Sequence, residues 1–158
     1  MKRHVQNVKL PWITAEGMID LTRFPIEGTL KQALDPNFEK FRSACVLLGS
    51  MAAYGRQEAG VYLIGLLGQN GSDLERLAVI VEQVGYFCDE ASANALFAEI
   101  RRVRSSNTTR RYLNTVLRSL TLLRLDSVKS RLEQLADDAT FSYKMRAKFR
   151  ECCERIRI

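Results

Sequence analysis

The sequence has a single histidine, His4, and no motif that binds a nucleotide phosphate. One histidine excludes a metal site built from several imidazoles and argues against a Ser-His or Cys-His catalytic mechanism. The stretch 65–71, GLLGQNG, is rich in glycine but lacks the lysine of a phosphate-binding loop and follows a helical pattern. We therefore expect no enzymatic activity, no cofactor and no bound metal ion.

Long hydrophobic runs are also missing. The longest apolar run, Val61 to Leu67, is far shorter than the roughly 20 residues of a membrane-spanning helix. The N-terminal sequence MKRHVQNVKLPW has no apolar region of the kind that a secretory signal contains. The four cysteines, at positions 45, 88, 152 and 153, form no C-x-x-C pair, and each falls on an otherwise apolar helical face. These features predict reduced core thiols in a cytoplasmic protein without a transmembrane segment.

A helical pattern begins in the stretch Asp35 to Gly49. Asp35 can cap a helix by accepting a backbone hydrogen bond, and Pro36 suits the first helical turn. Apolar side chains then recur at spacings of three and four residues, which predicts one buried helical face. These side chains are Phe38, Phe41, Cys45, Leu48 and Ala52.

Similar patterns follow along the rest of the chain and predict eight helices. Their starts fall about 16 to 18 residues apart, so pairs of helices repeat about every 33 to 36 residues, as in arrays of helical hairpins. The short turns make successive helices antiparallel neighbours. A compact closed bundle is the alternative. The expected starts are Pro25, Asp35, Arg56, Ser72 (a capping box with Glu75), Asp89 or Glu90, Asn107 or Thr108, Asp126 or Ser127, and Thr140 or Ser142.

Two stretches call for more particular expectations. The helix from Arg56 to Leu67 is apolar nearly all round, which predicts a central, buried position, with Gly60 and Gly65 allowing a neighbouring helix to approach. Residues 1–24 show no helical period, and we expect an irregular segment that covers the apolar end of the first helices, as terminal repeats require. A short strand within GMIDLTRF is an alternative there. The domain proper would then span residues 25–158.

The stretch DPNFEKFRSACVLLG resembles the second helix of a HEAT repeat, whose pattern is roughly D-P-N-x-x-V-R-x-x-A-A-x-x-L-G. A weaker echo occurs in RQEAGVYLIGLLG, at Arg56, Ala59, Leu63 and Gly65. The resemblance implies an all-α fold, an α-solenoid or HEAT-like array of about four hairpins. HEAT-like domains mostly bind proteins, and some bind nucleic acid. The main stretch matches at Asp35, Pro36, Asn37, Arg42, Ala44, Leu48 and Gly49, with Phe41 in the valine place and Cys45 in the second alanine place.

Charge is distributed unevenly along the chain. Residues 1–100 hold 9 Lys and Arg against 12 Asp and Glu, a net charge of −3, whereas residues 101–158 hold 15 against 6, a net charge of +9. The basic excess is mostly arginine. A one-sided basic surface favours an anionic partner, although solvated helix faces that happen to be rich in arginine have the same composition.

The densest cluster of arginines surrounds the polar turn SSNTT at 105–109. An antiparallel hairpin brings the arginines that end one helix next to those that begin the following one. Cations at a helix C-terminus complement the helix dipole, whereas Arg110 and Arg111 at a helix N-terminus oppose it, which favours a binding role. Pairing with carboxylates of neighbouring helices is the structural alternative. The candidate binding residues are Arg101, Arg102, Arg104, Arg110, Arg111 and Arg118.

Two functions follow from the fold and the arginine cluster. The first is a non-enzymatic scaffold that binds an acidic segment of a partner protein, because the planar guanidinium pairs well with carboxylates. The alternative is binding to the phosphate backbone of DNA or RNA, which would show a steep dependence on salt. Aromatic side chains do not alternate with the basic ones as a platform for base stacking requires. Some HEAT-like proteins are enzymes, but none of their catalytic residues is matched here.

Overall fold

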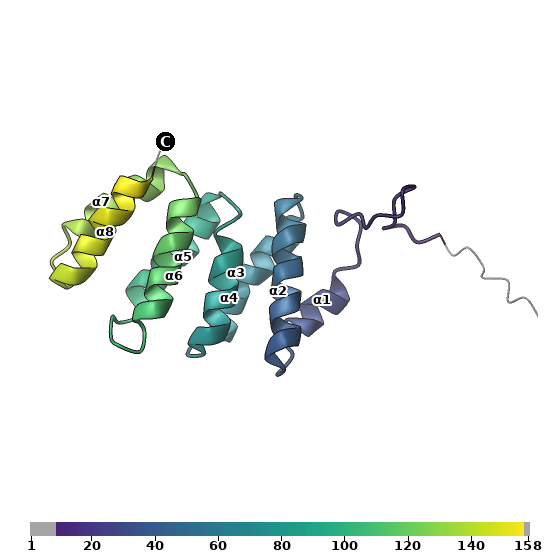
Figure 1. The fold of residues 1–158 in the computed structure, drawn as a ribbon, viewed down its shortest axis with the longest axis horizontal. Helices are drawn as coiled ribbons and strands as arrows, with labels where there is room; N and C mark the ends of the chain where they lie inside the picture. Colours follow the sequence, from purple (N-terminus) through teal and green to yellow (C-terminus); the bar gives the residue numbers. More distant parts are fainter. Residues whose placement is uncertain (1–8, 157–158) are drawn as a thin grey trace, which may run out of the picture.

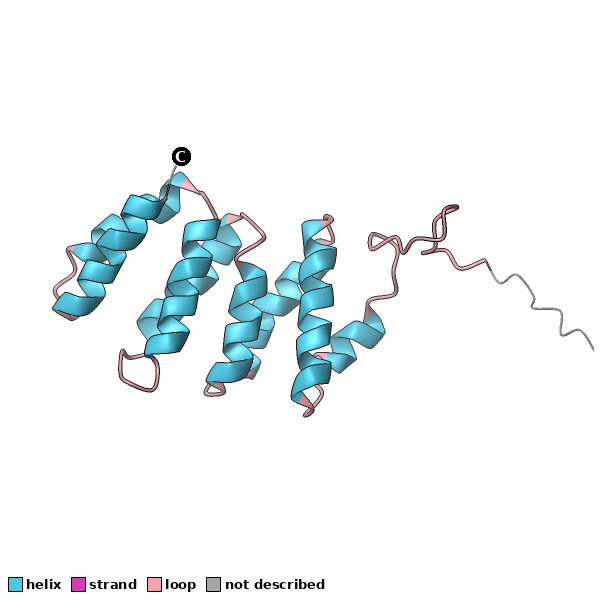
Figure 2. Ribbon diagram, viewed as in Figure 1, coloured by secondary structure: helices cyan, strands magenta, loops and turns pink. Residues whose placement is uncertain are grey.

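The computed structural model describes residues 9–156, and over this range the chain is all-α, with eight helices and no strand (Figure 2). The prediction of an all-α fold is confirmed. The helices are α1 (Glu27–Gln32), α2 (Phe38–Ala53), α3 (Gln57–Gln69), α4 (Leu74–Val84), α5 (Glu90–Arg102), α6 (Arg110–Leu122), α7 (Asp126–Ala136) and α8 (Tyr143–Arg155).

The helices pack as hairpins that stand side by side in two layers (Figure 1). Each odd-numbered helix contacts the even-numbered helix that follows it. Within one layer, α2 contacts α4, α4 contacts α6, and α6 contacts α8, while the odd-numbered helices form the other layer. Helices α1 and α8 lie at opposite ends of this elongated stack (Figure 1).

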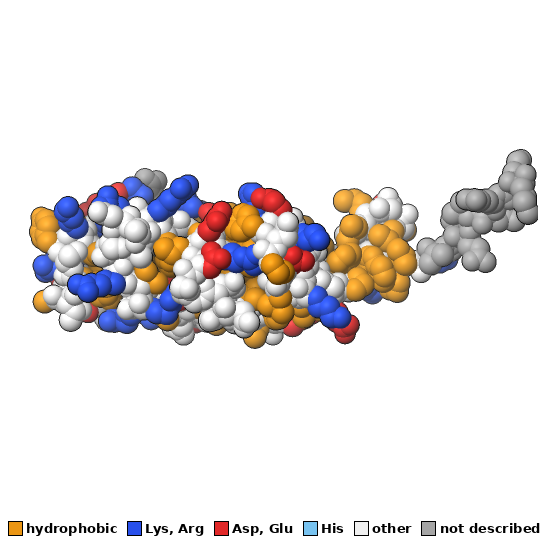
Figure 3. All heavy atoms as spheres, turned by 90° about the horizontal axis from the view of Figure 1, so that it is seen from below, with side chains coloured by type: hydrophobic (Ala, Val, Ile, Leu, Met, Phe, Trp, Pro, Cys, Tyr) orange, Lys and Arg blue, Asp and Glu red, His pale blue; other side chains and the backbone are white. Residues whose placement is uncertain are grey.

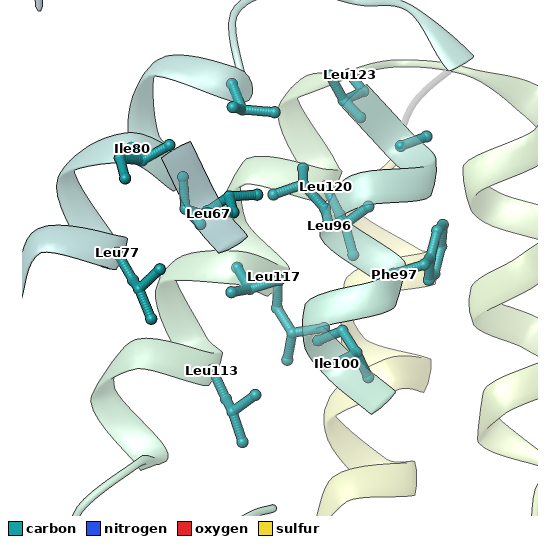
Figure 4. Close-up of a cluster of buried hydrophobic side chains, with 14 of the residues drawn as sticks. Leu67, Leu77, Ile80, Leu96, Phe97, Ile100, Leu113, Leu117, Leu120 and Leu123 are labelled. Atoms are coloured by element: carbon teal, nitrogen blue, oxygen red, sulfur yellow. The ribbon is translucent and has the colours of Figure 1, made fainter. Parts of the chain in front are cut away.

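Apolar side chains fill the space between the two layers. On α6, the buried residues Leu113, Leu117 and Leu120 recur at three- and four-residue spacing, so they share one face of the helix. This face meets side chains of α4 and α5 (Figure 4). The contributing residues include Leu77 and Ile80 of α4 and Leu96 and Ile100 of α5, all at most 2% exposed.

Three helix starts lie where the sequence places them. The Asp89 carboxylate caps α5 by accepting a 2.7 Å hydrogen bond from the Ser92 N–H. The Ser142 hydroxyl caps α8 by accepting a 3.2 Å bond from the Met145 N–H. Helix α7 begins at Asp126, as predicted, although its side chain makes no cap bond.

Two predicted caps are wrong by one or two residues. Helix α2 is capped by Asn37, which accepts a 3.0 Å bond from the Lys40 N–H, while Asp35 instead accepts a 2.8 Å bond from the Asn37 N–H in the turn before the helix. Helix α4 is capped by Asp73 rather than by Ser72. In both turns several polar residues can accept a backbone hydrogen bond, so the sequence alone does not select among them.

Two other starts also differ from the prediction. Helix α1 begins at Glu27, so Pro25 precedes the helix rather than occupying its first position. Helix α6 follows Thr109 and has no side-chain cap, so neither Asn107 nor Thr108 caps it. The Thr109 hydroxyl donates instead to the Arg104 carbonyl, at 2.6 Å, and so holds the loop before the helix.

Helix α3 is buried on one side only. Leu63 is fully buried, but Val61 is 70% exposed, so the prediction of a helix buried all round is wrong. A Cβ atom at Gly60 would lie 3.5 Å from the Phe87 ring and 3.7 Å from the Ala52 Cβ, which are ordinary contact distances, so no close backbone approach requires a glycine there and that expectation is wrong. At Gly65 it would meet nothing within 4 Å, so the same expectation is wrong for that glycine.

Three of the four cysteines are buried and one is exposed. Cys45, Cys152 and Cys153 are buried, as predicted. Cys88 is exposed and lies in the turn between α4 and α5, with a φ of 53°. The prediction that all four thiols belong to the core is therefore wrong for Cys88, because the apolar pattern around it ends with α4.

Residues 9–24 form no helix or strand. The alternative of a short strand reduces to a single antiparallel bridge between Ile13 and Ile19. Leu21 and Phe24 pack against the core, whereas Met18 is 68% exposed, so only the last part of this segment covers the apolar end of the helices. Residues 1–8 of the predicted capping segment lie outside the described residues.

Candidate functional site

All six candidate arginines are exposed, but the structure places five of them at two different hollows. Arg101, Arg102 and Arg104 line a pocket between the end of α5 and the start of α8. Arg111 and Arg118 line a groove between α4 and α6. The predicted cluster is thus two sites joined by the loop between α5 and α6.

The first hollow, called here the α5–α8 pocket, has a volume of about 500 Å³. Its rim carries the three arginines. Its floor is apolar and comes from both helices and from the loops beside them. The floor residues are Ile100, Val103, Phe141 and Met145.

Arg102 serves the fold itself. Its Nε and Nη2 atoms donate to the Glu99 carboxylate at 2.9 and 2.6 Å, and its Nη1 donates to the Gly71 carbonyl at 2.7 Å. Glu99 is 5% exposed and also accepts a 2.6 Å bond from the Tyr112 hydroxyl. Arg102 thereby compensates a buried carboxylate and ties α5 to the turn between α3 and α4.

The pKa values of this network agree with that arrangement. Hydrogen bonding to Glu99 raises the pKa of the Arg102 guanidinium, so it keeps its charge. Burial and the bond to Glu99 raise the pKa of the Tyr112 phenol, which therefore stays protonated and donates. The network is a structural element between neighbouring hairpins.

Arg101 and Arg104 are less constrained. The Arg101 guanidinium is 3.8 Å from the Asp138 carboxylate and 6.0 Å from the centre of the Phe141 ring, and its side chain is 64% exposed. Among the described residues, the Arg104 side chain has no ion pair and no hydrogen bond. Exposed pairs of this kind contribute only about 0–1 kcal/mol, so both cations are available to a ligand.

The second group lies on the outward face of α6. Arg111 and Arg118 are seven residues apart, so they stand on the same side of the helix two turns from each other. Arg118 is 3.2 Å from Glu82 on α4, while Arg111 has no ion pair within the described part of the chain. Arg110 points elsewhere and donates to the Asn107 side chain at 2.9 Å.

Two further cations belong to the same surface. Lys148 and Arg155 of α8, also seven residues apart, line a groove of about 370 Å³ together with Asn114 and Arg118 of α6. Lys148 donates to Asn114 at 2.9 Å, and Arg155 pairs with Glu151. The candidate residues chosen from the sequence include neither of these two. Their matching seven-residue spacing was the signal that could have joined them to α6.

The basic face is therefore defined as Arg111, Arg118, Lys148 and Arg155, on adjacent helices of one layer. In another view of the molecule, basic side chains are spread over the half formed by α5–α8, and hydrophobic ones gather at the opposite end (Figure 3). The charge asymmetry of the sequence is thus also an asymmetry of the surface.

The buried thiols do not offer a catalytic nucleophile. Burial raises the pKa of Cys45 to about 12 and that of Cys152 to about 11, so both stay protonated at neutral pH. Within residues 9–156, no group of three or more His, Cys, Asp or Glu side chains is placed to hold a metal ion. No helix in that range is long and apolar enough to cross a bilayer.

The chain matches no model of a protein family, no curated protein and no solved structure. The HEAT-like resemblance of residues 35–49 therefore stays a prediction.

Proposed function

We propose that this protein is a non-enzymatic, HEAT-like scaffold of the cytoplasm whose basic face binds an acidic segment of a partner protein. The observation that carries the proposal is the paired spacing on α6 and α8. Residues seven apart lie about 10 Å apart along a helix, and packed helices lie about 8–10 Å apart. The four cations thus mark the corners of a patch that an acidic helix or strand can span.

The ion pairs already present on the basic face do not prevent it from binding an acidic segment. Arg118 pairs with Glu82 and Arg155 pairs with Glu151, and all four side chains are at least half exposed. Since such pairs contribute about 0–1 kcal/mol, a carboxylate of a partner can replace either one at small cost. Arg111 and Lys148 have no carboxylate partner among the described residues.

A protein partner fits this face better than a phosphate backbone does. Glu82 and Glu151 stand among the cations. Every phosphate that passes near them is repelled, whereas a peptide of mixed charge can place a lysine or a neutral residue there. The described exposed aromatic residues, Tyr54, Tyr86 and Tyr143, lie on three different helices or their ends and form no continuous stacking surface.

The proposed fold rests on two independent features. The hairpins stack in two layers (Figure 1), as they do in helical repeat arrays, and the turn before α2 carries the D-P-N motif. In such arrays a continuous layer of helices offers an extended binding surface. Here that layer is α2, α4, α6 and α8, and its basic half is α6 and α8.

The test is the affinity for a labelled, helix-forming peptide of glutamate and alanine, measured by fluorescence anisotropy. We expect wild-type protein to bind it and the variant Arg111→Glu with Arg118→Glu to bind at least about tenfold more weakly, because charge reversal replaces attraction by repulsion. The helix content measured by circular dichroism should be unchanged, since both side chains are exposed.

The matched control is Lys40→Glu with Arg42→Glu, which reverses two exposed charges on α2 at the other end of the same layer. The control should bind like wild type. If it loses as much affinity as the α6 variant, binding follows net charge and the basic face has no special role.

A further inference from the structure

The α5–α8 pocket combines an apolar floor with a basic rim. We propose that it receives a large apolar side chain of the partner's acidic segment, while carboxylates on either side of that residue meet Arg101 and Arg104. This inference rests on the proposed function and adds what the acidic segment must contain.

The floor is apolar and fixed. Its accessible part comes from Val103 and Phe141, which are half-buried, whereas Ile100 and Met145, at 2% and 3% exposure, are buried. The Phe141 ring packs edge-on against Phe149, with ring centres 5.1 Å apart, which holds it in place. With about 500 Å³, the pocket falls within the range of roughly 300–1,000 Å³ that ligand pockets have.

The loop that bears Arg104 is held in its conformation before any ligand binds. The Thr109 hydroxyl donates to the Arg104 carbonyl at 2.6 Å and accepts from the Ser106 N–H at 2.8 Å. Arg102 fixes the end of α5 through Glu99 and Gly71. A preformed pocket saves the entropy of ordering a loop on binding, and that saving appears as affinity.

The rim and the floor together select an amphipathic ligand. A small anion would meet only exposed guanidinium groups, whose attraction is weakened by water and salt. A purely apolar ligand would have to bring the arginine rim out of water without a partner for its charge. An apolar side chain flanked by carboxylates satisfies both parts at once.

The pocket also adjoins the basic face. Met145, in the pocket, and Lys148, on the basic face, are three residues apart on α8, less than one helical turn. A single partner segment that follows α8 can therefore place its apolar residue in the pocket and its further carboxylates on the basic face.

The experiment compares two labelled glutamate-rich peptides that differ at one central residue, phenylalanine or alanine. We expect the wild-type protein to bind the phenylalanine peptide at least about tenfold more tightly, which corresponds to about 1.4 kcal/mol. Val103→Ser should remove most of this preference while keeping affinity for the alanine peptide, because it changes the floor and no charge. Arg104→Glu should weaken both peptides.

Arg42→Glu is the matched control for the charge change and should leave both affinities unchanged. Equal affinity for the two peptides would overturn the pocket inference and leave the proposed function standing. A preference for phenylalanine that survives Val103→Ser would also overturn it, because the apolar residue would then bind elsewhere. If neither peptide binds the wild-type protein, the proposed function fails as well.

Discussion

Two hairpin ends in this molecule carry arginines and use them in opposite ways. At the start of α4, the side chain of Arg76 is 14% exposed and donates to the carbonyl groups of Asp35 and Pro36, at 2.9 and 2.6 Å. Its guanidinium also lies 4.5 Å from the centre of the Phe41 ring. At the end of α5, Arg101 is 64% exposed and has one long ion pair.

The comparison shows that the number of arginines does not identify a binding surface. What matters is whether the donors of each guanidinium already have partners inside the fold. Arg76 and Arg102 hold neighbouring hairpins together through backbone carbonyls, and Arg131 does so by lying 4.0 Å from the Phe97 ring. Neither Arg104 nor Arg111 pairs with any residue within 9–156, so their charges are available to a partner.

The largest loss of stability is expected from a truncation in the core. Leu63 is fully buried on α3, so Leu63→Ala removes buried methyl groups and leaves a cavity. We expect a loss of about 2–5 kcal/mol in the free energy of unfolding, measured by urea titration. A loss below about 1 kcal/mol would show that α3 does not pack as described.

The next largest effect should come from the arginine that joins two hairpins. Arg76→Ala leaves the carbonyl groups of Asp35 and Pro36 without their partner and removes the contact with Phe41. Since hydrogen bonds to charged groups contribute about 1.5–3 kcal/mol, we expect a loss of about 2–3 kcal/mol in urea unfolding. Affinity for an acidic peptide at a temperature where the variant is folded should be that of wild type.

The smallest change in stability is expected at the free arginine. Arg104→Ala removes an exposed side chain that pairs with no described residue, so the free energy of unfolding should change by less than about 0.5 kcal/mol. The same variant should bind the acidic phenylalanine peptide more weakly. A large loss of stability in Arg104→Ala would show that this arginine also holds the fold together, as Arg76 does, and would contradict the contrast between the two hairpin ends.

Much of the fold could be predicted from the sequence, because the apolar period and the polar turns are local signals. The eight helices, their order and the caps at Asp89 and Ser142 follow from residues that lie close together in the chain. The caps at Asn37 and Asp73 were missed by one or two residues, since each turn offers several acceptors.

The division of the arginines could not be predicted, because it depends on contacts between distant residues. Arg102 meets Gly71, which is 31 residues away, and Arg76 meets Asp35, which is 41 away. Nothing in the local sequence of Arg101 and Arg102 separates the exposed side chain from the one that binds Glu99. Only the packing of one hairpin on the next assigns their roles.

On the proposed function, the basic face binds an acidic protein segment rather than a nucleic acid. The most direct measurement is fluorescence anisotropy of the labelled acidic peptide and of labelled DNA and RNA, each titrated with the protein at about 50 and 200 mM salt. We predict that the peptide binds at both concentrations, that Arg111→Glu with Arg118→Glu removes this binding, and that the nucleic acids bind more weakly. Tighter binding of DNA or RNA, with a steep loss at higher salt, would contradict the claim.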